Sequence, residues 1–181
     1  MTGEGYPSDC ELTEALRTRA MERNRPLERS AAWLAALKQA KPVHLLLLDV
    51  DGVLTDGSIT YTTGGGEIKS FNTQDGLGIK LLQESGVAVG IITARTSEAV
   101  TRRAQDLGLA HVYQGKRDKL LVFEAILKET GLRPPQTAYM GDDWMDLPVL
   151  NRVGFAAAPA NAVAEIRQRS EEHTSELQSQ R

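Results

Sequence analysis

The chain has 181 residues, of which 41% are hydrophobic and 25% charged, so we expect one globular domain and exclude a disordered chain. Its 21 Lys and Arg residues against 24 Asp and Glu residues give a formal charge of −3, which argues against a nucleic-acid-binding surface. The single cysteine, Cys10, excludes a disulfide framework and a cysteine-rich zinc site.

No segment has the pattern of a signal peptide or a membrane span. The longest strongly apolar stretch, Val43 to Leu48, is too short to cross a bilayer. Together with the single cysteine, this pattern favours a cytoplasmic protein with neither a membrane nor a nucleic-acid partner.

Three regions differ in composition. Residues 1–41 are polar and rich in Arg and Glu, and we interpret them as an N-terminal extension of one or two loosely attached helices. The structural signals are dense from residue 42 to residue 168, which we interpret as the domain. Residues 169–181 contain RSEEHTSELQS, which resembles the translation of a sequencing adapter, and we interpret them as a non-native tail.

Strands alternate with helices through the central region. The apolar run at 43–50 predicts a buried parallel strand, and the segments around Gly64 to Gly66 predict a β-hairpin. Further strands are predicted at 87–93, 111–114, 137–141 and 154–158, and helices at 75–85, 96–107, 117–130 and 142–153. This alternation predicts an α/β fold, a Rossmann-like parallel sheet with helices on both faces and ligands at the carboxyl ends of its strands.

The first strand ends in two carboxylates, Asp49 and Asp51. Because strand side chains alternate with period two, both are expected on the same side of the chain. Two close carboxylates repel each other unless a cation joins them, and Mg²⁺ prefers such oxygen ligands. An aspartate is also a usable nucleophile toward phosphorus while its neighbour moves a proton. Taken alone, the pair also fits a turn cap before Gly52.

Further polar residues follow predicted strands or open predicted helices: Thr93, Lys119, Asp142, Asp143 and Asp146. Each has a structural alternative, namely a hydroxyl that caps a helix, a solvated surface lysine, and acids that a helix N-terminus favours. A cation in the first turn of a helix opposes the helix dipole, so Lys119 there favours a specific anionic partner.

In combination, these residues resemble the four motifs of the haloacid dehalogenase superfamily. The segment DVDGVLTDG, at 49–57, is similar to the first motif. The threonine of IITAR, then Lys119 and then the segment GDDWMD follow in the order of the other three motifs. The resemblance implies a phosphatase that works through an aspartyl-phosphate intermediate.

The resemblance also implies a catalytic role for four residues. Asp49 would be the nucleophile. Asp51 would protonate the leaving sugar oxygen and then activate the water that cleaves the aspartyl phosphate. Thr93 and Lys119 would bind the phosphoryl oxygens.

A magnesium site follows from the same resemblance. Mg²⁺ would bind Asp49, the backbone carbonyl of Asp51 and Asp142, and would neutralise the phosphate charge. Asp143 and Asp146 would support this site, and the sequence leaves open which of the two lies nearer the metal.

The chain leaves no room for the cap domains of the superfamily. Between Asp51 and Thr93 a hairpin and a helix fit, and between Thr93 and Lys119 a helix and a strand. We therefore expect an uncapped hydrolase fold with a small hairpin flap. An uncapped site exposes the reacting phosphate to water. We therefore expect a second copy of the chain to cover the site.

The segments DVDGVLTDGSITY, GEIKSFNTQDGLGIKLL and GDDWMDLPVL resemble an uncapped branch, the 3-deoxy-D-manno-octulosonate 8-phosphate phosphatases. This resemblance implies Mg²⁺-dependent hydrolysis of an eight-carbon sugar acid phosphate in lipopolysaccharide biosynthesis by a homotetramer. It also implies a Gly-rich C-terminal arm, which we expect to be missing from this chain.

Four further residues are candidates for substrate contact. Asn72, Asp75 and Lys80 would contact the substrate or a neighbouring subunit, although hairpin packing explains Asn72 equally well. Arg95 would bind the phosphate or carboxylate of the substrate, or form a surface ion pair. Two other functions stay open: an uncapped phosphatase for another sugar acid phosphate, and a non-catalytic oligomerisation domain.

Overall fold

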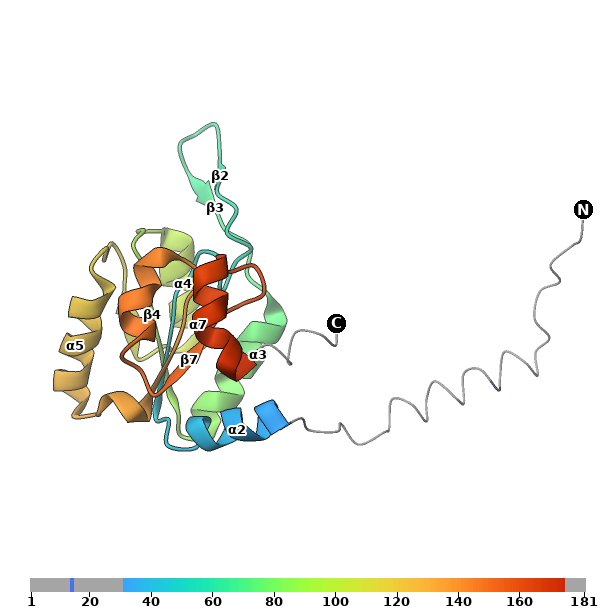
Figure 1. The fold of residues 1–181 in the computed structure, drawn as a ribbon. Helices are drawn as coiled ribbons and strands as arrows, with labels where there is room; N and C mark the ends of the chain where they lie inside the picture. Colours follow the sequence, from blue (N-terminus) through green and yellow to red (C-terminus); the bar gives the residue numbers. More distant parts are fainter. Residues whose placement is uncertain (1–13, 15–30, 175–181) are drawn as a thin grey trace, which may run out of the picture.

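A parallel five-stranded sheet forms the centre of the protein (Figure 1), whose computed structural model describes residue 14 and residues 31–174. The strand order is β5-β4-β1-β6-β7, so the first strand of the chain is the central one. The strands are β1 (Leu45–Leu48), β4 (Ala88–Ile92), β5 (His111–Tyr113), β6 (Thr137–Met140) and β7 (Phe155–Ala157).

Helices connect the strands and cover both faces of the sheet. They are α2 (Ala31–Ala40), α3 (Thr73–Glu84), α4 (Glu98–Leu107), α5 (Lys119–Thr130), α6 (Leu147–Leu150) and α7 (Ala164–Thr174). Two short 3₁₀ turns, η1 (Pro134–Gln136) and η2 (Trp144–Asp146), precede β6 and α6.

The core lies on both sides of the sheet because the side chains of β1 alternate between its faces. On the face covered by α5, α6 and α7, Leu47, Phe123 and Ile166 belong to one buried cluster. On the face covered by α3 and α4, Ile79 and Val100 belong to the other. The continuous leucine run of β1 therefore fits a strand that is buried on both faces.

A β-hairpin projects from the body of the protein near the carboxyl end of β1 (Figure 1). Its strands, β2 (Thr60–Tyr61) and β3 (Glu67–Ile68), pair antiparallel. In the described part of the chain, this hairpin and α3 are the elements between β1 and β4, and α4 and β5 are those between β4 and α5. The expected uncapped architecture is therefore confirmed, and so is the Rossmann-like α/β fold.

The described chain differs from the expected elements in two places. The helix expected at 142–153 is a 3₁₀ turn followed by the short helix α6. The helix α7 was not predicted, and it continues past residue 168, the expected end of the domain. The last part of the segment 1–41 forms α2, which packs against α7, while the rest lies outside the described residues except for Glu14, which is helical.

None of the described helices combines the length and the apolar character that crossing a membrane requires.

Candidate active site

The sheet brings the predicted site residues to one edge. In the parallel register, Leu48 pairs with Ile91 of β4 and with Met140 of β6. Asp49, Thr93 and Asp142 therefore follow three neighbouring strands at their carboxyl ends, where open α/β sheets bind ligands.

Asp49 is a buried carboxylate in which only one of the two oxygens has a partner among the described residues. Its Oδ2 atom lies 2.9 Å from Nζ of Lys119. Its Oδ1 atom is buried and has no hydrogen-bond partner among the residues that the structure describes. Burial raises the pKa of Asp49 to about 6, although Lys119 acts in the opposite direction. The unsatisfied oxygen and the raised pKa both indicate a site that a cation would complete.

Lys119, at the start of α5, is only 3% exposed. Burial alone would lower its pKa, but the charges of Asp49 and Asp146 outweigh this effect and raise the pKa above its ordinary value. Its Nζ atom donates to Oδ1 of Asp146 at 2.6 Å. The interpretation of Lys119 as a solvated surface residue therefore does not apply.

Asp146 is completely buried and accepts hydrogen bonds on both carboxylate oxygens. Oδ1 accepts from Lys119 and from the hydroxyl of Tyr139 at 2.6 Å, and Oδ2 accepts from the backbone amides of Asp142 at 3.0 Å and Asp143 at 3.1 Å. Four internal donors leave this carboxylate little capacity for a metal ion. We therefore interpret Asp146 as the anchor of the loop 141–146.

Asp143 faces outward, in contrast to Asp146. It is exposed, and its carboxylate accepts from the amide of Trp144 at 2.7 Å, as an N-cap of η2 does. Of the two supporting acids, Asp146 is the one that lies close to Asp49 and Asp142.

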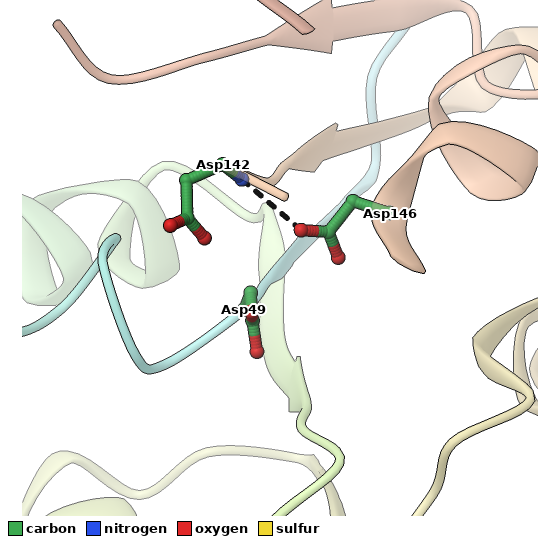
Figure 2. Close-up of side chains that lie close together, drawn as sticks. All are labelled: Asp49, Asp142 and Asp146. Carbon is green, nitrogen blue, oxygen red and sulfur yellow. Dashed lines mark hydrogen bonds between the residues drawn. The ribbon is translucent and has the colours of Figure 1, made fainter. Parts of the chain in front are cut away.

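Asp142 supplies the second unsatisfied oxygen. Its Oδ1 atom is buried without a hydrogen-bond partner in the described part of the chain. Burial first, and then the charges of Asp49, Asp146 and Asp143, raise its pKa to about 6. Figure 2 shows Asp49, Asp142 and Asp146 close together, and a carboxylate oxygen from each lies within 4.8 Å of the others.

This arrangement fits a hard divalent cation. Oδ1 of Asp49 and Oδ1 of Asp142 are unsatisfied carboxylate oxygens, the type of ligand that Mg²⁺ prefers. Although Asp146 is part of the same acidic cluster, its oxygens already accept four hydrogen bonds. The residues that fit the metal best are therefore Asp49 and Asp142.

Gly52 allows the loop after β1 to approach Asp142. Its backbone has φ of 88°, in the left-handed region that favours glycine. A Cβ atom at this position would lie 2.0 Å from Oδ2 of Asp142. The glycine therefore permits the close approach of the Asp51–Gly52 segment to the second acid.

Asp51 is held by two cations from other parts of the chain. Nζ of Lys69, next to β3, contacts its Oδ1 atom, and Nε of Arg95 lies 3.7 Å from its Oδ2 atom. Both cations also bind Glu67, and hydrogen bonding to Arg95 lowers the pKa of this glutamate below its ordinary value. The base of the hairpin is therefore fastened to Asp51 through shared ion pairs.

Thr93 ends β4 and is only 2% exposed. Its hydroxyl oxygen accepts from the backbone amide of Arg95 at 3.4 Å, and its carbonyl accepts from the amide of Lys116 at 2.9 Å. The threonine thus has a structural role in the turn after β4, at the same edge of the sheet as Asp49.

The candidate substrate residues occupy different places. Asn72 caps α3 by accepting from the amide of Gln74 at 2.8 Å, and with Asp75 it lines a cavity of about 410 Å³ beside the loop 53–56. Lys80 donates instead to the carbonyl of Leu107 at the end of α4.

Three residues at or near the site were not singled out from the sequence: Lys69, Tyr139 and Asn161. Tyr139 carried one signal, because a hydroxyl within a buried strand requires a hydrogen-bond partner. Asn161 follows β7 and donates from Nδ2 to the carbonyl of Gly52 at 2.8 Å. Lys69 and Asn161 carried no local signal, since their partners lie 18 and 109 residues away.

Known proteins with similar sequences are phosphatases. The chain is 43% identical over 126 residues to the 3-deoxy-D-manno-octulosonate 8-phosphate phosphatase of Salmonella typhi, a match that covers 70% of this chain and 67% of that protein. The phosphatase of the same name from Escherichia coli K12 matches with the same identity and coverage. No protein-family model matches the chain.

Solved structures agree with these relatives. The crystal structure of a probable YrbI family phosphatase from Pseudomonas syringae has a TM-score of 0.75 and 47% identity, and the match covers 76% of this chain and 78% of that one. A 3-deoxy-D-manno-octulosonate 8-phosphate phosphatase from Moraxella catarrhalis, in complex with a magnesium ion, a phosphate ion and KDO, has a TM-score of 0.74 and 40% identity. That match covers 76% of this chain and 79% of the other.

Proposed function

Because this chain belongs to the 3-deoxy-D-manno-octulosonate 8-phosphate phosphatases of the haloacid dehalogenase superfamily, we propose that it hydrolyses this eight-carbon sugar acid phosphate. The products are 3-deoxy-D-manno-octulosonate and inorganic phosphate, in lipopolysaccharide biosynthesis. The reaction depends on Mg²⁺ and passes through an aspartyl phosphate.

The observation that carries the proposal is the state of Asp49. One carboxylate oxygen is paired with Lys119, while the other has no hydrogen-bond partner among the described residues. A carboxylate oxygen of Asp49 also lies within 4.8 Å of one of Asp142. A purely structural aspartate would have its buried oxygens satisfied by hydrogen bonds. The arrangement suits a nucleophile whose negative charge is balanced while it approaches phosphorus.

The proposed reaction has two displacements at phosphorus. A carboxylate oxygen of Asp49 forms a bond to phosphorus as the bond to the sugar oxygen breaks, and Asp51 gives a proton to that oxygen. Water then attacks the phosphorus of the aspartyl phosphate, and Asp51 accepts a proton from this water. The bond between phosphorus and Asp49 breaks, which releases phosphate and restores both carboxyl groups.

Positive charge assists both steps. Lys119 and the hydroxyl of Thr93 bind phosphoryl oxygens, and Lys119 is already beside Asp49. Asp49, Asp142 and the backbone carbonyl of Asp51 hold Mg²⁺, which supplies charge stabilisation to the phosphoryl group when bound. We also expect Arg95, which is paired with Glu67 and lies near Asp51, to bind an anionic group of the substrate.

We also propose that the chain assembles as a homotetramer and that it is cytoplasmic. Apolar side chains are exposed on the hairpin and on α3: Ile59, Tyr61, Ile68, Leu77 and Leu81. The hairpin projects from the body (Figure 1), and because all five side chains are exposed, they are accessible to a second copy that would cover the uncapped site. Sedimentation equilibrium tests the subunit count, and a monomer at micromolar concentration contradicts the assembly.

The test of function is Mg²⁺-dependent phosphate release from 3-deoxy-D-manno-octulosonate 8-phosphate, beside a panel of other sugar phosphates. We expect a strong preference for the eight-carbon substrate and no turnover by Asp49→Asn. A matched control is Asp106→Asn, because Asp106 is an exposed aspartate in α4 that belongs to none of the motifs.

The panel also separates the alternatives. Turnover of another sugar acid phosphate would retain the mechanism but contradict the substrate. Absence of turnover with every substrate, together with normal assembly of Asp49→Asn, would favour a non-catalytic oligomerisation domain.

A further inference from the structure

The segment between β7 and α7 touches both loops of the proposed metal site. The side chain of Asn161 donates from Nδ2 to the carbonyl of Gly52 at 2.8 Å. Two residues later, the backbone amide of Val163 donates to the carbonyl of Asp142 at 3.0 Å. One short segment is therefore bonded to the loop that contains Asp51 and to the loop that contains Asp142.

This segment is itself firmly attached to the core. Ala162 is 5% exposed and Ile166 is fully buried, and both belong to the apolar cluster beneath α7. The amide of Ile166 also donates to the carbonyl of Val163 at 3.1 Å, at the start of the helix. Asn161 itself is exposed, but the backbone that follows it is fixed by packing that does not involve the acidic residues.

The bond from Asn161 acts on the Gly52–Val53 peptide group, which is the next one along the chain after the Asp51 carbonyl. Only the backbone angles φ and ψ of Gly52, with φ of 88°, separate these two peptide groups. Because Asn161 holds the Gly52 carbonyl, it restricts the movement of this glycine. The Asp51 carbonyl, a proposed ligand of the metal, is therefore attached to a restrained neighbour.

We infer that Asn161 is a positioning residue for the divalent metal: it holds the Gly52 carbonyl and thereby restrains the adjoining Asp51 carbonyl, a proposed ligand, beside the loop of Asp142. The inference rests on the proposed metal site. Ligands that are fixed before the ion arrives lose less conformational freedom on binding, and partners outside the ligand shell change metal affinity for this reason.

The test compares Mg²⁺ binding by wild type, Asn161→Ala and Asn161→Leu in isothermal titration calorimetry with Mg²⁺ alone. Loss of one hydrogen bond predicts about three- to tenfold weaker binding by both variants. The leucine variant keeps the side-chain volume but lacks the donor. In phosphate release, the Mg²⁺ concentration for half-maximal rate should rise by the same factor, while the rate at saturating Mg²⁺ recovers.

The matched control is Asn151→Ala. Oδ1 of Asn151 accepts from Nε of Arg169 in α7 at 2.8 Å, so this variant also removes an asparagine contact with that part of the structure. We expect its Mg²⁺ affinity to equal that of wild type. The melting temperature without metal shows whether any variant is unfolded.

The outcomes are distinct. Equal Mg²⁺ binding by wild type and Asn161→Ala would overturn this inference alone, and so would an equal loss in Asn151→Ala. Absence of Mg²⁺ binding by the wild-type chain would overturn the proposed metal site together with it.

Discussion

Nζ of Lys119 lies 2.6 Å from Oδ1 of Asp146 and 2.9 Å from Oδ2 of Asp49, so one buried cation joins the anchoring carboxylate to the proposed nucleophile. The lysine is therefore held by an acid that is not expected to react. In the proposed mechanism, Asp49 loses its charge when it bonds to phosphorus, and Asp146 would still keep Lys119 in place. Separate acids can thus carry the structural and the chemical roles.

Asp146→Asn should destabilise the protein strongly. The amide would place a donor against Lys119 and Tyr139 or against the backbone amides of the loop, and Lys119 would lose a buried counter-charge. Breaking a buried ion pair costs about 3–5 kcal/mol. Urea unfolding measures this loss. Glu124→Gln is the control, because its pair with Arg152 is exposed and should contribute less than about 1 kcal/mol. Equal losses in the two variants would contradict the anchoring role.

Tyr139→Phe should have a smaller effect on stability. The variant removes the hydroxyl that donates to Oδ1 of Asp146 at 2.6 Å but leaves the buried ring. We expect a loss of about 1–2 kcal/mol in the free energy of unfolding, measured in urea. Tyr113→Phe removes a hydroxyl whose bond to Glu129 is exposed, and it should cost less than about 0.5 kcal/mol. A larger loss for Tyr113→Phe would argue against the buried network as the source of the effect.

Magnesium binding should strengthen as pH rises through 6. Burial raises the pKa of both Asp49 and Asp142 to about 6, and a carboxyl group must lose its proton to bind Mg²⁺. Calorimetric titration from pH 5 to pH 8 should show a steep rise in affinity below pH 6 and a plateau above pH 7. Affinity that does not change across this range would contradict the assignment of these two ligands.

The same pKa shifts predict how the stability of the metal-free protein depends on pH. The folded-state pKa values of Asp49 and Asp142 lie above their unfolded value of 3.8. The stability that these two groups contribute is therefore fully present below pH 3.8. It is then lost as pH rises through about 6. Mg²⁺ should therefore raise the melting temperature more at pH 8 than at pH 5. Asp142→Asn should reduce this difference, while Asp106→Asn should leave it unchanged.

Gly52→Ala should weaken metal binding by more than the strain of its positive φ alone would explain. The new Cβ would meet Oδ2 of Asp142 at 2.0 Å, so the second acid would have to move. We expect the Mg²⁺ requirement of phosphate release to rise by about 10–100-fold. Gly65→Ala is a close control, because its φ of 84° gives a similar backbone strain while its Cβ would meet nothing within 4 Å. If both variants need the same Mg²⁺ concentration, backbone strain alone explains the result.

Most of the sheet and the acidic residues could be predicted from the sequence because their signals are local. The run at 45–48 is apolar throughout, and Asp49 follows it directly. In contrast, α7 could not be predicted, because Ile166 is the only large apolar residue in its sequence and nearly all the others are polar. Asn161 was missed because its partner Gly52 is 109 residues away.

The central place of β1 also has a consequence for how the protein folds. Asp49 follows β1, but Asp142 follows β6, and 88 residues of chain, 49–136, lie between these two paired strands. A partly folded chain in which β1 has paired with β4 alone would contain Asp49, the proposed nucleophile, without Asp142 beside it. Mg²⁺ would then bind the completed sheet in preference to such intermediates, so the ion would favour the last stage of folding by mass action.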